Sequence, residues 1–361
     1  MPPSLPDLAS FAPPQPQGQT PYAWPAFRKP AENHAQTGAI DMYVGPTFFR
    51  RVDPSCYDPA ARLRDMDAAG VDVQVLSTVP VLFCYDAPLA PARVLARALN
   101  DHVSGVCAKY PERFVGLGTV PLQNCDAAVE ELRRVMGLPG MVGVQIGTSV
   151  EEEEGVVMLD DERLEGFWKA CEELNVPVFV HPLGYALTKE NKGRWGKYWR
   201  IKPGQAQIWI DSLLHDPDLM GYVLRKLGPG GASRIVLGSD YPFPLGEVPV
   251  AGKMLMENEQ LEQFMSWKER AGVLARNAIH FLNLGKEFEN RFEKRFRQFE
   301  IARSDAVGLA DGQRDGWRHR DSAIELDEED GVGKFGCHNV RVADRDVLSL
   351  GNETRSHNRS F

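Results

Sequence analysis

The sequence lacks the features that would direct a protein to a membrane or to nucleic acid. No apolar stretch reaches the ~18 residues that a membrane-spanning helix requires. The formal net charge is −9 and no long basic block is present, so nucleic acid and anionic membranes are poor candidates for a partner. The first residues also lack the basic start and apolar core of a secretory signal.

Cysteine is sparse and shows no pairing pattern. The six cysteines, at positions 56, 84, 107, 125, 171 and 337, form no C-x-x-C motif. A chain of 361 residues can bury a large core without disulfides, so we expect reduced thiols and a cytoplasmic protein. The composition, 43% hydrophobic and 25% charged, is that of a globular protein.

Composition divides the chain into four segments. Residues 1–33 hold nine prolines and four charged residues without periodicity, which predicts a disordered N-terminal segment. Residues 34–284 contain the periodic apolar patterns that can build one domain. Residues 285–300 follow as a charged amphipathic helix, and residues 301–361 form a polar tail that we predict to be disordered.

The helix at 285–300 carries one aromatic stripe. Phe288, Phe292, Phe296 and Phe299 recur at spacings of 4, 4 and 3 residues, which places them on one face. We expect this stripe to pack on the main domain or on a partner subunit. A functional aromatic site is the alternative.

Short β-branched runs alternate with helical patterns through the main domain. Six runs are predicted to be strands: Val71–Leu76, Phe114–Gly118, Val142–Ile146, Val176–Val180, Gln207–Ile210 and Arg234–Gly238. Helices are predicted at 92–110, at 126–136 and after Asp161. This alternation predicts a parallel sheet, and six strands favour a TIM-like (β/α)₈ barrel. An open doubly wound sheet is the alternative, although no G-x-G-x-x-G follows the first strand.

The predicted barrel is incomplete. Six strands fall short of the eight that a closed barrel contains. Residues 181–206 lie between two predicted strands and are rich in glycine, lysine and aromatic residues. They contain no convincing crossover helix, although adjacent parallel strands need a covering connection. Either these two strands are not neighbours, or an element between them is missing.

Two polar residues follow apolar strands and are candidates for chemistry. His181 follows VPVFV and Asp240 follows RIVLGS. The carboxyl ends of parallel strands are where active sites gather, and imidazole and carboxylate both suit Zn²⁺. A hydrogen-bonded loop histidine and a turn aspartate are the alternatives. Two ligands are fewer than the three that a catalytic zinc site usually takes.

The remaining candidates give weaker signals. Arg50, in TFFRRVDP, could bind a carboxylate or could be an ordinary surface arginine. The histidines form no H-x-H or H-x-x-x-H pair. His102 is predicted to be a packing residue, His215 to be structural just before a helix capped by Asp216 or Asp218, and His280 to lie in the core.

Five sequence blocks together resemble one family of decarboxylases. They are DPAARLRDMDAAGVDVQVLSTVPVLFCY, YPERFVGLGTVPLQ, GVQIGTSV, VPVFVHP and VLGSDYPFPLGE, and they span about residues 34–284. This arrangement is similar to 2-amino-3-carboxymuconate 6-semialdehyde decarboxylases of the amidohydrolase superfamily. The resemblance implies a Zn²⁺-dependent barrel that removes a carboxylate from an intermediate of tryptophan–kynurenine breakdown. It also implies that His181 and Asp240 are metal ligands and that Arg50 holds a substrate carboxylate.

The sequence departs from this family at two places. The family's first strand ends in H-x-H, and its sixth is followed by an H-G-G-G histidine that is the proposed acid/base; neither motif is present. The first and sixth strands are therefore the two missing from the predicted barrel, and no catalytic acid/base is assigned. The family's shared arginine suggests a homodimer. We expect a decarboxylase of weak activity, with a related hydrolase or aromatic-acid decarboxylase, or a truncated non-catalytic homologue, as alternatives.

Overall fold

The described part of the chain covers the predicted domain with several gaps. The computed structural model describes residues 1–2, 4–11, 21–30, 38–152, 155–181, 209–214, 216–243, 252–294 and 296–297. The predicted tail at 301–361 and most of the interval that lacks a crossover helix lie outside these residues. Within the described ranges, no helix combines the length and apolar character that a membrane crossing requires.

Four parallel strands form the central sheet of the larger unit. They are β4 (Gln74–Leu76), β5 (Phe114–Gly118), β6 (Met141–Gly147) and β9 (Val178–His181), hydrogen-bonded in that order. The order follows the sequence, as the right-handed crossovers of a barrel require. Each of these strands overlaps a predicted one, so the parallel arrangement is confirmed.

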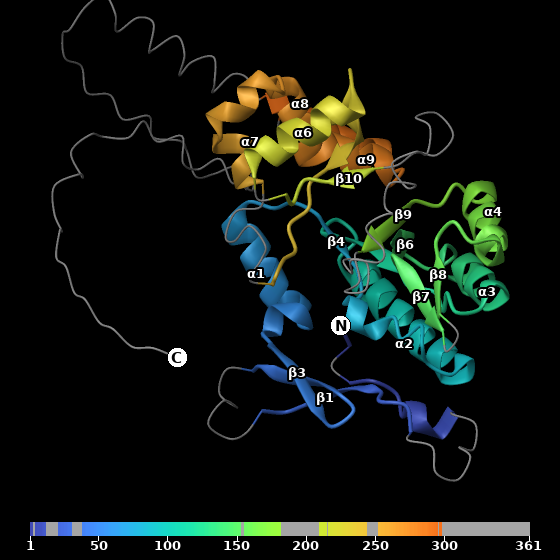
Figure 1. Cartoon of the computed structure of the whole chain (residues 1–361). Coiled ribbons are helices and arrows are strands. Elements are labelled where there is room, and N and C mark those ends of the chain that lie inside the picture. The colour runs from blue at the N-terminus through green and yellow to red at the C-terminus, as the bar shows by residue number, and fades with distance from the viewer. Residues whose placement is uncertain are drawn as a thin grey trace, which may run out of the picture.

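Helices cover the outer face of this sheet (Figure 1). They are α1 (Pro59–Ala69), α2 (Leu89–Lys109), α3 (Cys125–Val135) and α4 (Glu165–Glu173). Alternate residues of β6, Val144 and Ile146, are fully buried in a cluster with Leu132 and Phe167 of these helices. Because successive strand residues point to opposite faces, Gln145 and Gly147 face the interior of the barrel instead.

A smaller unit holds the remaining two barrel strands. β10 (Ile210–Asp211) and β11 (Ile235–Val236) pair in parallel, separately from the larger sheet. Their helices are α6 (Pro217–Leu227), α7 (Lys253–Glu257), α8 (Trp267–Ala271) and α9 (Asn277–Phe281), which form the upper unit of Figure 1. Asp216 caps α6 as predicted, and buried Asn277 donates hydrogen bonds to the carbonyls of Ala232 and Ile235.

The barrel is open at the two predicted places. In the described residues, β4 and β9 form the edges of the larger sheet, and neither pairs with β10 or β11. The gap between β9 and β10 corresponds to the sixth strand, and the gap between β11 and β4 to the first. Val75 and Val180, on the two edge strands, are 41% and 38% exposed, which is unusual for a barrel strand. The structure is thus an incomplete (β/α)₈ barrel.

The N-terminal segment is more ordered than predicted. β1 (Pro25–Arg28), β2 (Ile40–Val44) and β3 (Thr47–Val52) form an antiparallel sheet, in which β1 pairs with β2. The prediction of disorder over 1–33 is therefore wrong for 25–28. It also fails at Leu8, which is 3% exposed and packs with α2 residues such as Leu95.

Short elements complete the described chain. β7 (Ser149–Glu152) and β8 (Gly155–Met158) form a hairpin after β6. One-turn elements are η1 (Leu8–Phe11), η3 (Pro54–Cys56), η4 (Pro80–Leu82), η5 (Glu162–Leu164), η7 (Gly231–Arg234), η8 (Glu259–Gln263) and the π-helical η9 (Gly272–Arg276). Asp161 caps η5 just before α4, as predicted.

The predicted amphipathic helix packs against the barrel. Residues 286–294 are helical, and Phe288 joins an apolar cluster with Val115 and Leu117 of β5. Phe292 is 6% exposed, so these two residues of the stripe pack as predicted, whereas Phe299 lies outside the described residues.

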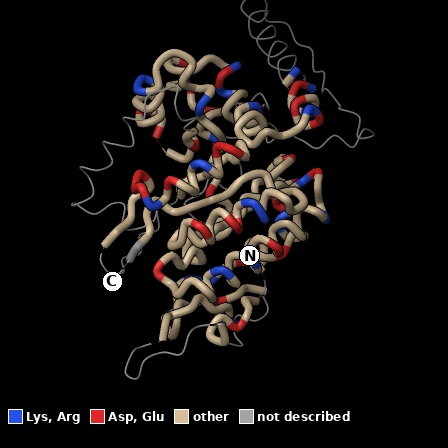
Figure 2. The backbone as a smooth tube through the Cα atoms, turned by 90° about the vertical axis from the view of Figure 1, so that its right-hand side faces the viewer, with Lys and Arg blue, Asp and Glu red and all other residues tan. Residues whose placement is uncertain are grey.

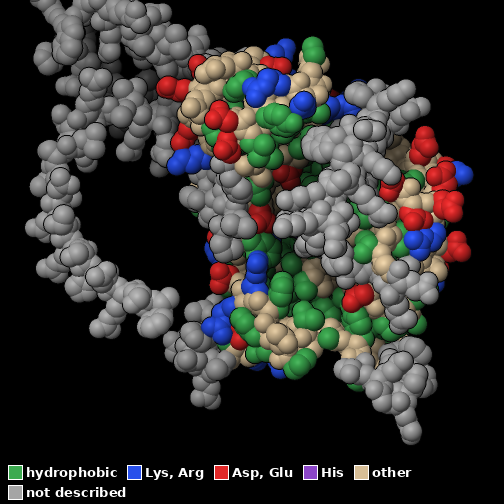
Figure 3. Space-filling model, viewed as in Figure 1, with side chains coloured by type: hydrophobic (Ala, Val, Ile, Leu, Met, Phe, Trp, Pro, Cys, Tyr) green, Lys and Arg blue, Asp and Glu red, His purple; other side chains and the backbone are tan. Residues whose placement is uncertain are grey.

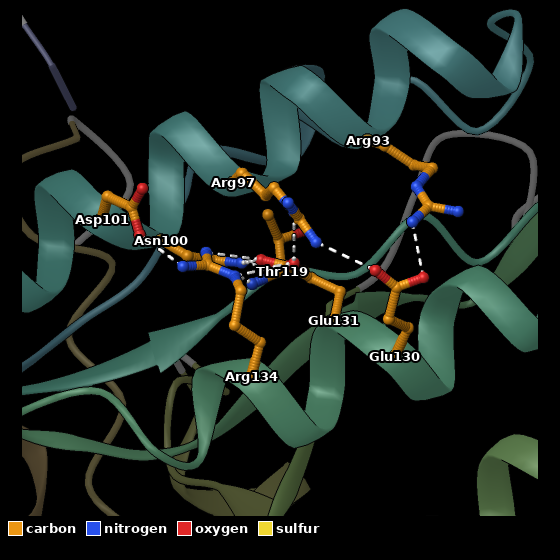
Figure 4. Close-up of polar contacts among 8 residues, drawn as sticks. All are labelled: Arg93, Arg97, Asn100, Asp101, Thr119, Glu130, Glu131 and Arg134. Carbon is orange, nitrogen blue, oxygen red and sulfur yellow. Dashed lines mark hydrogen bonds and ion pairs between the residues drawn. The ribbon is translucent and has the colours of Figure 1, made fainter.

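A polar network joins α2 to α3 (Figure 4). Buried Asn100 donates to the Thr119 carbonyl at 2.9 Å and to Glu131 at 2.7 Å, and accepts from the Thr119 backbone N–H at 2.8 Å. Arg134 pairs with Glu131 at 2.8 Å. Elsewhere in the described chain, Figure 2 shows charges of both signs interspersed and no large area of one sign.

Replacing Asn100 with leucine is expected to lower the free energy of unfolding by about 2–4 kcal/mol, because the substitution leaves the buried Thr119 amide groups unpaired. The control is Arg93→Leu, which removes only an exposed pair with Glu130 and costs about 1 kcal/mol or less. Urea denaturation followed by circular dichroism measures both. Equal losses in the two variants would contradict the assignment of stability to Asn100.

Candidate active site

A large cavity lies inside the open barrel. Its volume is about 1040 Å³, and its wall includes Val115, Leu117 and Phe179 on the inner face of the sheet. Figure 3 shows this side of the molecule hollowed between the upper unit and the sheet, with hydrophobic side chains along the hollow. Leu282 and Phe288 pack against Val115 and Leu117 and also line the cavity.

His181 and Asp240 both line this cavity. His181 is the last residue of β9, and Asp240 lies four residues after β11. The strands belong to two different sheets, each of which is parallel, and a residue at or beyond the carboxyl end of each strand borders the same cavity. The two residues selected from the sequence therefore border the same cavity, and their role as ligands stays a prediction.

The chain after β11 is shaped by close contacts. A Cβ atom on Gly238 would lie 2.7 Å from the Asp211 carboxyl carbon, so only glycine fits there. Asp240 has φ of 47°, in the left-handed region that few residues other than glycine, asparagine and aspartate adopt. Its carbonyl accepts a hydrogen bond from Phe243 N–H at 2.8 Å. This tight turn fixes the position of the Asp240 side chain relative to the strand.

His181 and Asp240 are ligand types that divalent cations bind, but the described residues supply only these two. Imidazole and carboxylate are ligands of zinc and of similar ions. Among the residues that the structure describes, no three of histidine, cysteine, aspartate and glutamate gather at one place. His34 and His215 lie outside the described ranges. The described residues thus supply two donors and do not form a complete catalytic metal site.

Arg50 lies on β3, and its guanidinium carbon is 4.7 Å from the centre of the Phe243 ring. Phe243 lines the cavity, so Arg50 contacts a residue of the cavity wall. The neighbouring Arg51 points to the other face of the strand, where it binds both carboxylate oxygens of Asp41, at 2.6 and 3.0 Å. Arg50 itself is exposed and is not among the residues that line the cavity, so its role as a carboxylate ligand stays a prediction.

Sequence analysis missed a polar network behind Asp240. Arg62 lines the cavity and donates hydrogen bonds to the Ser55 carbonyl at 3.1 Å and to the Gln74 side-chain oxygen at 3.0 Å. Its guanidinium carbon lies 5.0 Å from the centre of the Tyr241 ring. The Tyr241 hydroxyl donates to Asp65. Burial, together with this carboxylate, raises the pKa of Tyr241 to about 12, so the phenol stays neutral at physiological pH. The network fastens the loop after β11 to α1.

Gln145 was also missed, although the sequence carried a signal. It is the only polar side chain in the VGVQI run, and it occupies a position that faces the barrel interior. It lines the cavity and is 1% exposed. A polar residue at an inward position of an otherwise apolar strand is a signal for a site residue.

His102 lines the cavity, whereas His280 lies on the surface. His102, on α2, lines the cavity, and burial lowers its pKa to about 4, so it is neutral at physiological pH. His280 was predicted to lie in the core, but it is exposed at the end of α9, with its ring 6.0 Å from that of Trp209.

The fold and the strand-end residues define an incomplete barrel of the metal-dependent hydrolase class. The family model described as Amidohydrolase matches residues 23–228. The 2-amino-3-carboxymuconate-6-semialdehyde decarboxylase of Dictyostelium discoideum is 30% identical over 308 residues, covering 67% of this chain and 81% of its own. The chain therefore belongs to the amidohydrolase family, within which it is a carboxy-lyase similar to that decarboxylase.

Two further comparisons agree with this result. The gamma-resorcylate decarboxylase of a Rhizobium species is 33% identical over 181 residues, covering 47% of this chain and 55% of that one. The crystal structure of Metarhizium anisopliae IDCase in apo form covers 77% of this chain and 93% of its own, with 16% identity and a TM-score of 0.53. At this identity the structural similarity shows the fold alone.

Proposed function

We propose that this chain decarboxylates 2-amino-3-carboxymuconate 6-semialdehyde in tryptophan–kynurenine breakdown. The observation that carries the proposal is that His181 and Asp240 both line one cavity. It is supported by the similarity to the Dictyostelium decarboxylase over most of both chains. A cytoplasmic location and a homodimer remain predictions.

Residues of this chain would bind and orient the substrate. Arg50 holds a carboxylate by paired hydrogen bonds, which the planar guanidinium makes in a fixed geometry. The apolar wall formed by Val115, Leu117 and Phe179 excludes water from the conjugated part of the substrate. In the reaction the C–C bond to the carboxylate breaks, CO₂ leaves, and the carbon takes up a proton. No described residue is assigned as the donor of this proton.

A divalent cation is proposed to bind between His181 and Asp240, with Zn²⁺ as the first choice. Such an ion polarises bound substrate and lowers the pKa of bound water. The described residues supply two protein donors, fewer than the three of an ordinary catalytic site, so we expect weak binding. Weak cation binding would in turn give the weak activity that we propose for this chain.

A related aromatic acid is the second candidate substrate. The similarity to a gamma-resorcylate decarboxylase, 33% identical over 47% of this chain, favours it. A panel containing the semialdehyde and 2,6-dihydroxybenzoate separates the two candidates, because loss of absorbance by one alone identifies the preferred class.

Removing either proposed ligand should weaken cation binding. We expect His181→Ala and Asp240→Asn each to raise the Kd for Zn²⁺ or Mn²⁺ at least about tenfold, because each removes one of two donors. Isothermal titration of the metal-stripped full chain measures the Kd, and the decarboxylation rate should follow cation occupancy. The control is His280→Ala, an exposed histidine outside the cavity. Unchanged stoichiometric binding in both ligand variants would show that other residues hold the ion.

Replacing Arg50 with lysine should weaken carboxylate binding. We expect a Kd for 2,6-dihydroxybenzoate roughly tenfold higher, because lysine cannot form the paired hydrogen bonds of a guanidinium. Tryptophan fluorescence quenching measures the Kd without requiring turnover. The matched control is Arg51→Lys, which disturbs the Asp41 pair on the other face and should leave the Kd unchanged. Equal effects of the two substitutions would exclude a specific role for Arg50.

A further inference from the structure

Gln145 holds a buried hydrogen-bond acceptor with no partner among the described residues. Its Nε2 group donates to the Thr78 carbonyl at 3.0 Å, which fixes the orientation of the amide. Its Oε1 atom is inaccessible to solvent and makes no hydrogen bond. A buried acceptor left in this state costs about 1–3 kcal/mol, so it implies a missing partner.

The position of Gln145 places this acceptor in the candidate site. β6 pairs with β9 so that Gln145 lies opposite Phe179, and Gly147 lies opposite His181. Gln145 and His181 are therefore on the same inner face, two residues apart along the strands. Thr78 follows β4, so the amide lies across the C-terminal edge of the sheet. Gln145 belongs to the cavity wall at this edge, so a ligand donor reaches the buried acceptor by displacing the side chains that cover it.

We propose that Gln145 is a specificity-determining residue whose Oε1 atom accepts a hydrogen bond from a substrate donor next to the departing carboxylate. The proposal rests on the proposed function. Both substrate candidates carry such a donor. In 2-amino-3-carboxymuconate 6-semialdehyde an amino group is on the neighbouring carbon, and in gamma-resorcylate two hydroxyl groups flank the carboxylate. A fixed neutral acceptor selects these acids over analogues that lack the donor, because the analogues leave the acceptor unpaired.

The test compares two ligands of similar size. 2,6-Dihydroxybenzoate carries the donors, and 2,6-difluorobenzoate does not. The readout is the ratio of their Kd values, measured by tryptophan fluorescence on the full chain with Zn²⁺ present. We expect the dihydroxy acid to bind about tenfold more tightly to the unchanged protein. In Gln145→Met, which has no amide oxygen, the ratio should fall to about one.

A matched control is available in Gln123. Its Nε2 group donates to the Cys84 and Ala87 carbonyls, and its Oε1 atom is likewise buried without a partner, but it does not line the cavity. Gln123→Met should therefore keep the tenfold ratio. Gln145→Asn keeps a neutral amide that both donates and accepts and should keep a ratio clearly above one, which also decides the case if Gln145→Met fails to fold.

The outcomes separate the inference from the proposed function. If the unchanged protein binds neither ligand, the cavity does not take aromatic acids and the role of Gln145 is overturned, whereas turnover of the semialdehyde in the substrate panel decides the proposed function separately. If it binds both acids equally, or if Gln145→Met keeps the tenfold ratio, only the role of Gln145 is overturned. A tenfold ratio that persists in Gln145→Met is also the result expected if a trapped water, and not a ligand, is bound to Oε1.

Discussion

The site depends on a single constraint, the common direction of the barrel strands. Parallel strands place their carboxyl ends at the same edge, so residues that follow different strands meet there. This holds for β9 and β11 although no hydrogen-bonded ladder joins their sheets among the described residues. His181 and Asp240 share one cavity because of this direction, and Gln145 faces it because of the pleat of β6.

The open barrel leaves apolar strand faces that the chain covers only in part. Leu282 and Phe288 pack against Val115 and Leu117, which the interior layers of a closed barrel would otherwise cover. Val75 and Val180, on the edge strands, remain exposed. The helix at residues 286–294 therefore covers part of the inner face and contributes to the wall of the cavity. The same openness that enlarges the cavity removes two strands that could have carried further ligands.

Much of this arrangement could be read from the sequence, and the failures have physical causes. Apolar β-branched runs such as Phe114–Gly118 identified the strands, because burial on both faces leaves a continuous apolar pattern. β1 could not be found in this way, since its order comes from pairing with β2, which is not local in sequence. His181 and Asp240 were found because they follow strands. Arg62 was missed because its role depends on folded contacts with Ser55, Gln74 and Tyr241 that no sequence pattern indicates. Gln145 was missed although a polar residue inside the apolar VGVQI run was a readable signal.

The most direct test is a crystal structure of the full chain grown with Mn²⁺ or Zn²⁺, with the cation located by its anomalous scattering. The account predicts an anomalous peak in contact with both the His181 imidazole and the Asp240 carboxylate, inside the cavity. A cation bound at another place, or these two side chains directed into separate spaces, would contradict it.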